Sequence, residues 1–150
     1  MTQLFNLLND DCAKDLAKST VSVGDVYRIE MNKSNGIIPK SGDSSRHKFF
    51  VILGFDIDGN AYGGVIINSN INQNMPQTIK DWQMPIRCSK YDFLEHDSFV
   101  DCSKLKCASI EKFGMWQFKG CIEQDDIELI VDTIKSSPNE TTGHLALYGL

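Results

Sequence analysis

Residues 46–70 read RHKFFVILGFDIDGNAYGGVIINSN, and this stretch contains two apolar runs separated by a turn. The run from Phe49 to Phe55 predicts a buried strand, and the Asp58-Gly59 pair after it is a frequent hairpin signal. The second run, residues 61–70, predicts another strand, and its Gly63-Gly64 pair predicts a bulge or a bend. The stretch therefore predicts a hairpin in a fold rich in β-structure.

The rest of the chain continues this pattern. Apolar and polar residues alternate over 26–31, which predicts a strand, and residues 32–45 carry the Gly, Pro, Asn and Ser of a long surface loop. Beyond a second polar loop at 71–81, strands are expected at 83–88 and 97–102, and residues 109–120 fit either a short strand or a turn. The tail after Pro138 is expected to add a short strand.

Two segments have the periodicity of helices. Residues 3–18 repeat apolar side chains at helical spacing, and residues 123–136 place Ile127, Ile130, Val131 and Ile134 on one face behind a cluster of acidic residues. We expect an N-terminal helical extension over 1–22 and one domain over 23–150. Short strands separated by turns, with helices at the two ends, predict a small curled barrel.

The composition is that of a globular domain. The chain has 150 residues, of which 41% are hydrophobic and 23% charged, and its net charge of -5 argues against coating nucleic acid by charge alone. Residues 28–48 nevertheless hold five Lys or Arg against two acids, a local charge of +3. This segment can form a local basic groove.

Cysteine use and hydropathy suggest a cytoplasmic protein. The five cysteines are an odd number without a CxxC motif, and the three histidines are not at zinc-finger spacing, so no metal or other cofactor is expected. The N-terminus lacks the pattern of a signal peptide, and no apolar run approaches the roughly 20 residues of a membrane span.

Arg46, His47 and Lys48 stand directly before the apolar run of residues 49–53. They either mark the solvated end of a strand or are held by that strand over an anion such as an RNA phosphate. Side chains alternate between the two faces of a strand, so Arg46 and His47 should not both serve one site.

Three aromatic residues near the basic loop could stack on RNA bases, namely Tyr27, Phe49 and Phe50, although the core also needs such residues.

The order of several motifs resembles the MazF/PemK family of growth-inhibiting endoribonuclease toxins. These motifs are VGDVYRIEM (23–31), RHKFFVIL (46–53), VIINSNIN (65–72), HDSFVDCSKL (96–105) and KGCIEQDDIELIV (119–131). The resemblance covers about 23–136. It implies an SH3-like barrel, a homodimer, an antitoxin partner and metal-independent cleavage of single-stranded RNA.

The resemblance also suggests where a site would lie. The family's usual active pair is an arginine near the start of the second strand and a threonine or serine on the next strand. Here those regions give Arg46, His47 and Ser69 as catalytic candidates, of which His47 has the chemistry of a general acid or base. Candidate substrate-binding residues are Lys48, Asn68, Asn70 and Arg87.

Three functions fit the sequence. The first is a toxin-like endoribonuclease or an RNA-binding relative of one. The second is a catalytically inactive SH3-like module for protein interaction, which is favoured by His47 at the position of the family's arginine, by the absence of a proline after it and by Asn68 at the position of its threonine. The third, an unrelated hydrolase, has neither a G-x-S-x-G motif nor a metal-ligand pattern to support it.

Overall fold

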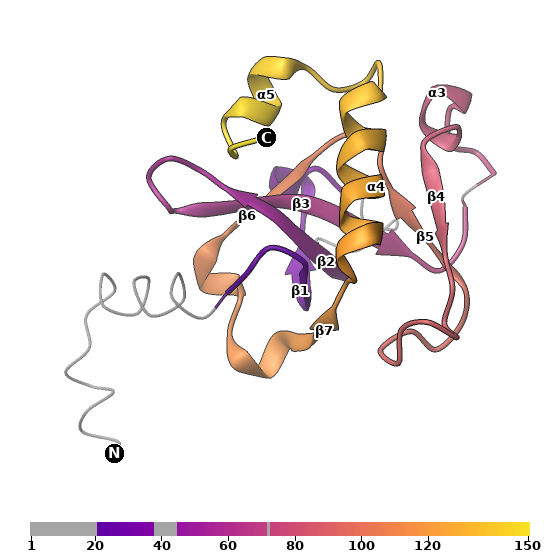
Figure 1. The fold of residues 1–150 in the computed structure, drawn as a ribbon, viewed down its shortest axis with the longest axis horizontal. Coiled ribbons are helices and arrows are strands. Elements are labelled where there is room, and N and C mark those ends of the chain that lie inside the picture. The colour runs from indigo at the N-terminus through magenta and orange to yellow at the C-terminus, as the bar shows by residue number, and fades with distance from the viewer. Residues whose placement is uncertain (1–20, 38–44, 72) are drawn as a thin grey trace.

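The computed structural model describes residues 21–37, 45–71 and 73–150. Within them the chain forms an antiparallel sheet of seven strands with a few helices (Figure 1). The strands are β1 (Asp25–Met31), β2 (Arg46–Phe55), β3 (Ala61–Asn68), β4 (Gln83–Ile86), β5 (Ser98–Asp101), β6 (Lys106–Ser109) and β7 (Phe118–Cys121). The helices are α3 (Gln77–Lys80), α4 (Gln124–Ser136) and α5 (Thr142–Ala146), with 3-10 turns η1 (Lys33–Asn35), η2 (Ile110–Lys112) and η3 (Met115–Gln117).

The β2–β3 hairpin lies in the middle of the sheet, whose strand order is β4-β5-β3-β2-β1-β7. Strand β3 has two further partners besides β2, because β5 pairs with its end at 67–68 and β6 with its start at 61–64. The predicted hairpin is confirmed.

The two adjacent glycines of β3 lie opposite an irregularity in β2. Ile52 pairs with Gly64 and Gly54 pairs with Gly63, so Leu53 is the extra residue of a β-bulge. A Cβ atom on Gly63 would lie 2.6 Å from Cγ of Tyr148. The bulge predicted at these glycines is therefore present on the partner strand. Gly63 leaves room for the C-terminal segment, whereas Gly64 leaves room for Phe50 and the backbone of β2.

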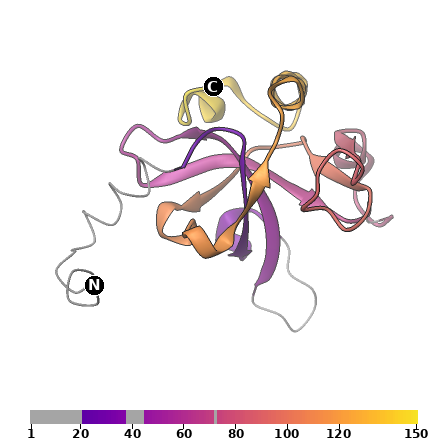
Figure 2. The ribbon, with the colours of Figure 1, turned by 60° about the horizontal axis from the view of Figure 1, so that its bottom comes forward.

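The two faces of the sheet are covered differently. Helices α4 and α5 lie together on one side of the sheet, as Figure 2 shows, and their apolar residues join the core on that face. The opposite face packs against the η2 turn and Phe113. Largest among the fully buried side chains of this second face are Tyr62, Phe50, Ile29 and Met31.

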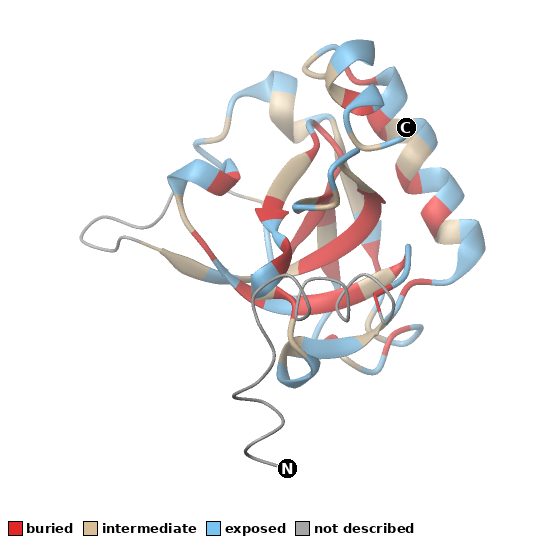
Figure 3. Cartoon of the chain, turned by 90° about the vertical axis from the view of Figure 1, so that its left-hand side faces the viewer, coloured by how far each residue is buried: buried red, intermediate tan, exposed pale blue. Residues whose placement is uncertain are grey.

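Helix α4 confirms the helix predicted at 123–136. Ile127, Ile130 and Ile134 are buried, and Val131 is partly buried against the same core. Figure 3 shows the buried positions concentrated on the strands and on the side of α4 that faces them. Asp125 and Asp126 lie in the first turn, where they complement the positive end of the helix dipole.

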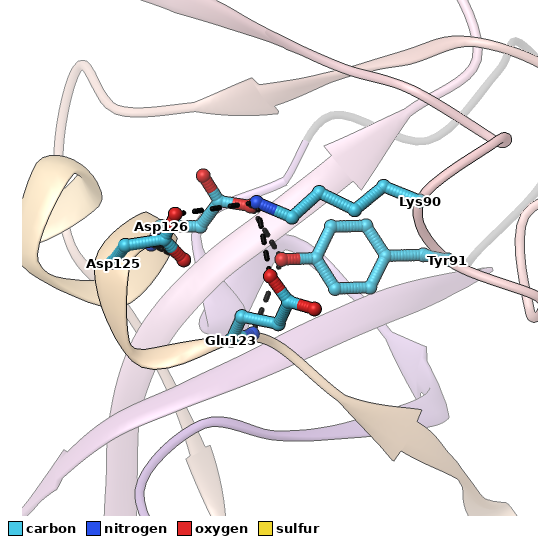
Figure 4. A network of polar contacts seen from close by, with 5 residues as sticks. All are labelled: Lys90, Tyr91, Glu123, Asp125 and Asp126. Atoms are coloured by element: carbon cyan, nitrogen blue, oxygen red, sulfur yellow. Dashed lines mark hydrogen bonds and ion pairs between the residues drawn. The ribbon is translucent and has the colours of Figure 1, made fainter.

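A polar network fastens the start of α4 to the loop before β5 (Figure 4). Nζ of Lys90 lies 3.1 Å from Glu123 and 3.0 Å from Asp126, and the Tyr91 hydroxyl donates to Asp126 and accepts from the backbone N–H of Glu123. Burial would raise the pKa of Asp126, but the bonds from Tyr91 and Lys90 outweigh it and lower that pKa. These bonds account for the network as a structural one, which holds the start of α4 against the loop before β5.

Several sequence predictions need correction. Strand β2 begins at Arg46, three residues before the predicted start, because its charged residues at 46–48 already pair with β1. Strand β6 was not predicted, the loop at 71–81 contains α3, and residues 109–120 form two turns and the start of β7. The C-terminal tail forms helix α5, not a strand, since Leu145 is buried in the core and Thr141 caps the helix. The predicted N-terminal helix lies outside the described residues.

Candidate functional site

A cleft of about 600 Å³ opens at the edge of β1. Strand β7 pairs with β1 only as far as Tyr27, so the next residues of β1 have no β7 partner. The segment from η2 to β7 runs past this free edge, and Nζ of Lys112 donates to the backbone carbonyl of Glu30 at 2.7 Å. The cleft is lined by Arg28, Ile29, Glu30, His47, Glu111, Lys112, Trp116, Gln117 and Lys119.

Glu30 and His47 are direct partners in the antiparallel pair of β1 and β2. Their Cβ atoms therefore lie on the same face, at the typical cross-strand separation of about 5 Å. Arg28 is two residues from Glu30 on that face, which is about 7 Å along the strand. The carboxylate of Glu30 is held by Ser45, whose hydroxyl donates to Oε1 at 2.7 Å.

A second β-bulge brings Lys119 to the cleft. Val26 pairs with Gly120 and Tyr27 pairs with Phe118, so Lys119 is the extra residue of β7. A bulge bends its strand and re-aims a side chain, and bulges often lie next to functional sites. Lys119 is exposed and lines the cleft.

The residues predicted from the sequence separate into two groups. His47 lies in the cleft, whereas Arg46 and Lys48 lie on the other face of β2, as the alternation of side chains predicted. Nζ of Lys48 donates to Oδ1 of Asn68 at 2.6 Å, so these two substrate-binding candidates are in contact.

The remaining candidates lie elsewhere along the same end of the sheet. Ser69 and Asn70 are exposed in the turn after β3. Arg87 follows β4, which is separated from β2 by β5 and β3. Asp97 accepts the backbone N–H of Cys88 at 3.0 Å, which lowers the Asp97 pKa, and the charge of Arg87 adds to this effect. Neither Ser69 nor Arg87 belongs to the residues that line the cleft.

Arg28, Glu30 and Trp116 were not identified as site residues from the sequence. The alternation in VYRIEM does place Arg28 and Glu30 on one strand face, which was a usable signal. Only the pairing register between β1 and β2 brings Arg28 and Glu30 close to His47, and these strands are separated by a long stretch of sequence. Trp116 belongs to a segment without clear periodicity.

The described ranges contain no group of three or more His, Cys, Asp or Glu residues arranged to hold a metal ion. Their four cysteines are free thiols. No helix within those ranges is long and apolar enough to cross a membrane. The chain matches no protein-family model, and no curated protein matches it significantly.

Proposed function

We propose that this protein is a metal-independent endoribonuclease for single-stranded RNA, with Glu30, His47 and Arg28 at its reaction centre. The observation that carries the proposal is the cross-strand pair of Glu30 and His47, which shares one cleft with Arg28. A carboxylate, an imidazole and a guanidinium together can serve as base, acid and phosphate-binding group. These are the three roles that RNA cleavage by its own 2′-hydroxyl requires.

The reaction would proceed by internal transfer. The Glu30 carboxylate takes the proton of the 2′-hydroxyl, and the 2′-oxygen forms a bond to the adjacent phosphorus. The bond from phosphorus to the 5′-oxygen breaks, and protonated His47 gives its proton to that leaving oxygen. Arg28 stabilises the charge that grows on the non-bridging oxygens, for which its planar fork is well suited. The products are a 2′,3′-cyclic phosphate and a free 5′-hydroxyl.

The resemblance to the MazF/PemK family is consistent with this proposal. An SH3-like barrel is supported by the seven antiparallel strands, by the three partners of β3 and by the helix α4 after the last strand. In this proposal Arg28 on β1 takes the role that the resemblance gave to an arginine at the start of β2. Cytoplasmic RNA would be the substrate, and an antitoxin would be the protein partner.

Cleavage of a mixed-sequence single-stranded RNA in the presence of a metal chelator tests the proposal. We expect wild-type protein to cleave and His47→Ala and Glu30→Gln each to lose about 100- to 10,000-fold in rate, the usual contribution of general acid-base catalysis. Arg28→Ala should lose a similar factor, and Arg28→Lys should recover part of it because lysine keeps the charge without the fork.

Arg46→Ala and Ser69→Ala are matched comparisons, because both residues belong to the sequence-based assignment and neither lines the cleft. If these two variants lose activity while Glu30→Gln and Arg28→Ala retain it, catalysis belongs to the residues predicted from the sequence. If wild-type protein neither binds nor cleaves RNA at low salt, the endoribonuclease proposal is wrong.

The alternative is a catalytically inactive interaction module. Its specific support is the exposure of Met115 and Trp116, at 80% and 85%, on a segment beside the cleft.

The resemblance also leads us to propose a homodimer, the most common closed oligomer. Sedimentation at tens of micromolar, chosen to be well above about a micromolar affinity, should show a species of twice 16.9 kDa.

A further inference from the structure

The segment that carries Trp116 is fixed at both ends. The rings of Phe113 and Phe118 both pack edge-on against Tyr27, with centroid separations of 5.4 Å and 5.5 Å. Phe113 and Tyr27 are buried. Lys112 adds a hydrogen bond to β1 immediately before this segment. The four residues between the two anchored rings therefore form a short, supported projection from the sheet.

Trp116 lies at the outer part of this projection, and 85% of its surface is exposed. Within the described ranges its indole ring pairs with no other aromatic ring, although Phe113 and Phe118 on either side of it both do. The indole ring is a flat apolar surface in contact with water. Burying this surface against a ligand is favourable because it removes apolar area from water.

The surroundings of Trp116 are polar and carry a small excess of positive charge. Three cationic side chains (Arg28, Lys112, Lys119) and two carboxylates (Glu30, Glu111) line the same cleft, together with the side-chain amide of Gln117. An apolar protein surface would gain little from these charges, whereas a nucleotide strand supplies a phosphate for the cations and a base for the indole. Gln117 can donate to and accept from a base edge.

We propose that Trp116 and Gln117 form a nucleobase subsite, in which an unpaired base stacks on the indole while the neighbouring phosphate lies at Arg28 and Lys119. This inference deepens the proposed function and rests on it. It restricts the substrate to RNA in which the base beside the cleaved phosphate is free, because a base inside a duplex cannot offer its face to the indole. Stacking on the indole does not distinguish one base from another. Any preference for a particular base would come from hydrogen bonds between Gln117 and the base edge.

Tryptophan fluorescence tests the subsite directly. The chain has two tryptophans, so a Trp82→Phe background leaves Trp116 as the sole reporter. The probes are a mixed-sequence 2′-O-methyl oligonucleotide, which lacks the attacking hydroxyl, the same strand in a duplex, and polyphosphate. We expect the single strand to quench Trp116 and the duplex and polyphosphate to leave its emission unchanged.

Affinity measurements on variants provide the second readout. Trp116→Ala should raise the Kd for the single strand about 5- to 150-fold, which corresponds to the usual 1–3 kcal/mol of one stacked base. Trp116→Phe should retain most of the affinity. Met115→Ala is the matched control, since Met115 is nearly as exposed as Trp116 but does not line the cleft. Gln117→Ala should reduce differences in affinity between homopolymers.

The outcomes separate this inference from the proposed function. If the single strand binds and is cleaved but Trp116→Ala changes neither Kd nor rate, the subsite is wrong and the endoribonuclease stands. If polyphosphate competes as well as the oligonucleotide, binding is through charge alone and the subsite is wrong. If no RNA binds, both the nucleobase subsite and the endoribonuclease proposal are wrong. A blue shift of Trp116 emission with rising protein concentration, lost in Met115→Ala, would assign the projection to contact between two copies.

Discussion

Glu30 and His47 face each other across strands β1 and β2, although 16 residues of sequence separate them. Cross-strand partners are close enough to interact directly, so in the proposed endoribonuclease we expect the contributions of Glu30 and His47 to be coupled. The double variant Glu30→Gln/His47→Ala should be little slower than the slower single variant. A double-mutant cycle on the rate of RNA cleavage measures this, and strictly additive losses would show that the two residues act independently.

Ile130 fixes helix α4 to the sheet, because its side chain is fully buried in the core beneath the helix. Ile130→Asp places an unpaired charge in apolar surroundings and should lower the free energy of unfolding by about 3 kcal/mol or more. The control is Leu129→Asp on the same helix, where 51% of the side chain is exposed and the loss should be within about 0.5 kcal/mol. Urea denaturation compares the two, and equal stabilities would contradict the packing of α4.

The Tyr62 hydroxyl is buried and has no hydrogen-bond partner in the described ranges, and burial raises the pKa of Tyr62 to about 12. Tyr62→Phe removes a polar group that was desolvated without compensation and should raise stability by about 1–2 kcal/mol. Tyr91→Phe is the opposite case, since the Tyr91 hydroxyl bonds both Asp126 and Glu123 and its loss should destabilise. Thermal melting of both variants checks the contrast. A destabilised Tyr62→Phe protein would mean that the hydroxyl has a partner.

Gly63 leaves space for the ring of Tyr148, which a Cβ atom would approach to 2.6 Å. Gly63→Ala should therefore cost about 1–3 kcal/mol of stability, the usual effect of overpacking. Gly143 in helix α5 has no atom within 4 Å of an added Cβ, so Gly143→Ala should be neutral or stabilise by up to about 1 kcal/mol. A Gly63→Ala protein with wild-type melting would show that the C-terminal segment packs elsewhere.

Glu140 should make the stability of the fold depend on pH in the acid range. Burial would raise its pKa, but bonds from the backbone N–H groups of Leu105 and Thr141 and from His144 outweigh burial and lower it. A lowered pKa in the folded state adds stability above the unfolded value of about 4.3, and that stability is lost as the pH falls through the folded pKa. Glu140→Gln should lower stability at pH 7 and flatten its fall below about pH 5.

The pH dependence of urea denaturation measures this effect. Glu95→Gln, at an exposed position, is the control and should keep the wild-type slope. If Glu140→Gln retains the full acid dependence, other carboxylates are responsible for it.

The sequence by itself determined the elements whose patterns are local. Alternation identified β1, apolar runs identified β2 and β3, Asp58-Gly59 identified the turn between β2 and β3, and the spacing of Ile127, Ile130 and Ile134 identified α4. These signals are readable because each residue's environment follows from its near neighbours. Alternation also separated Arg46 from His47, and it did so before any register was known.

Only the tertiary structure decided which side chains line the same cleft. His47 was identified from its chemistry, but Glu30 joins it through the pairing register, and Lys119 through a bulge against β1. Trp116 projects because Phe113 and Phe118 both contact Tyr27, which lies some 90 residues earlier in the chain. Strand β6 and helix α5 depend in the same way on distant partners. Contacts between residues far apart in sequence leave no periodic pattern in either segment, and therefore only the folded chain shows them.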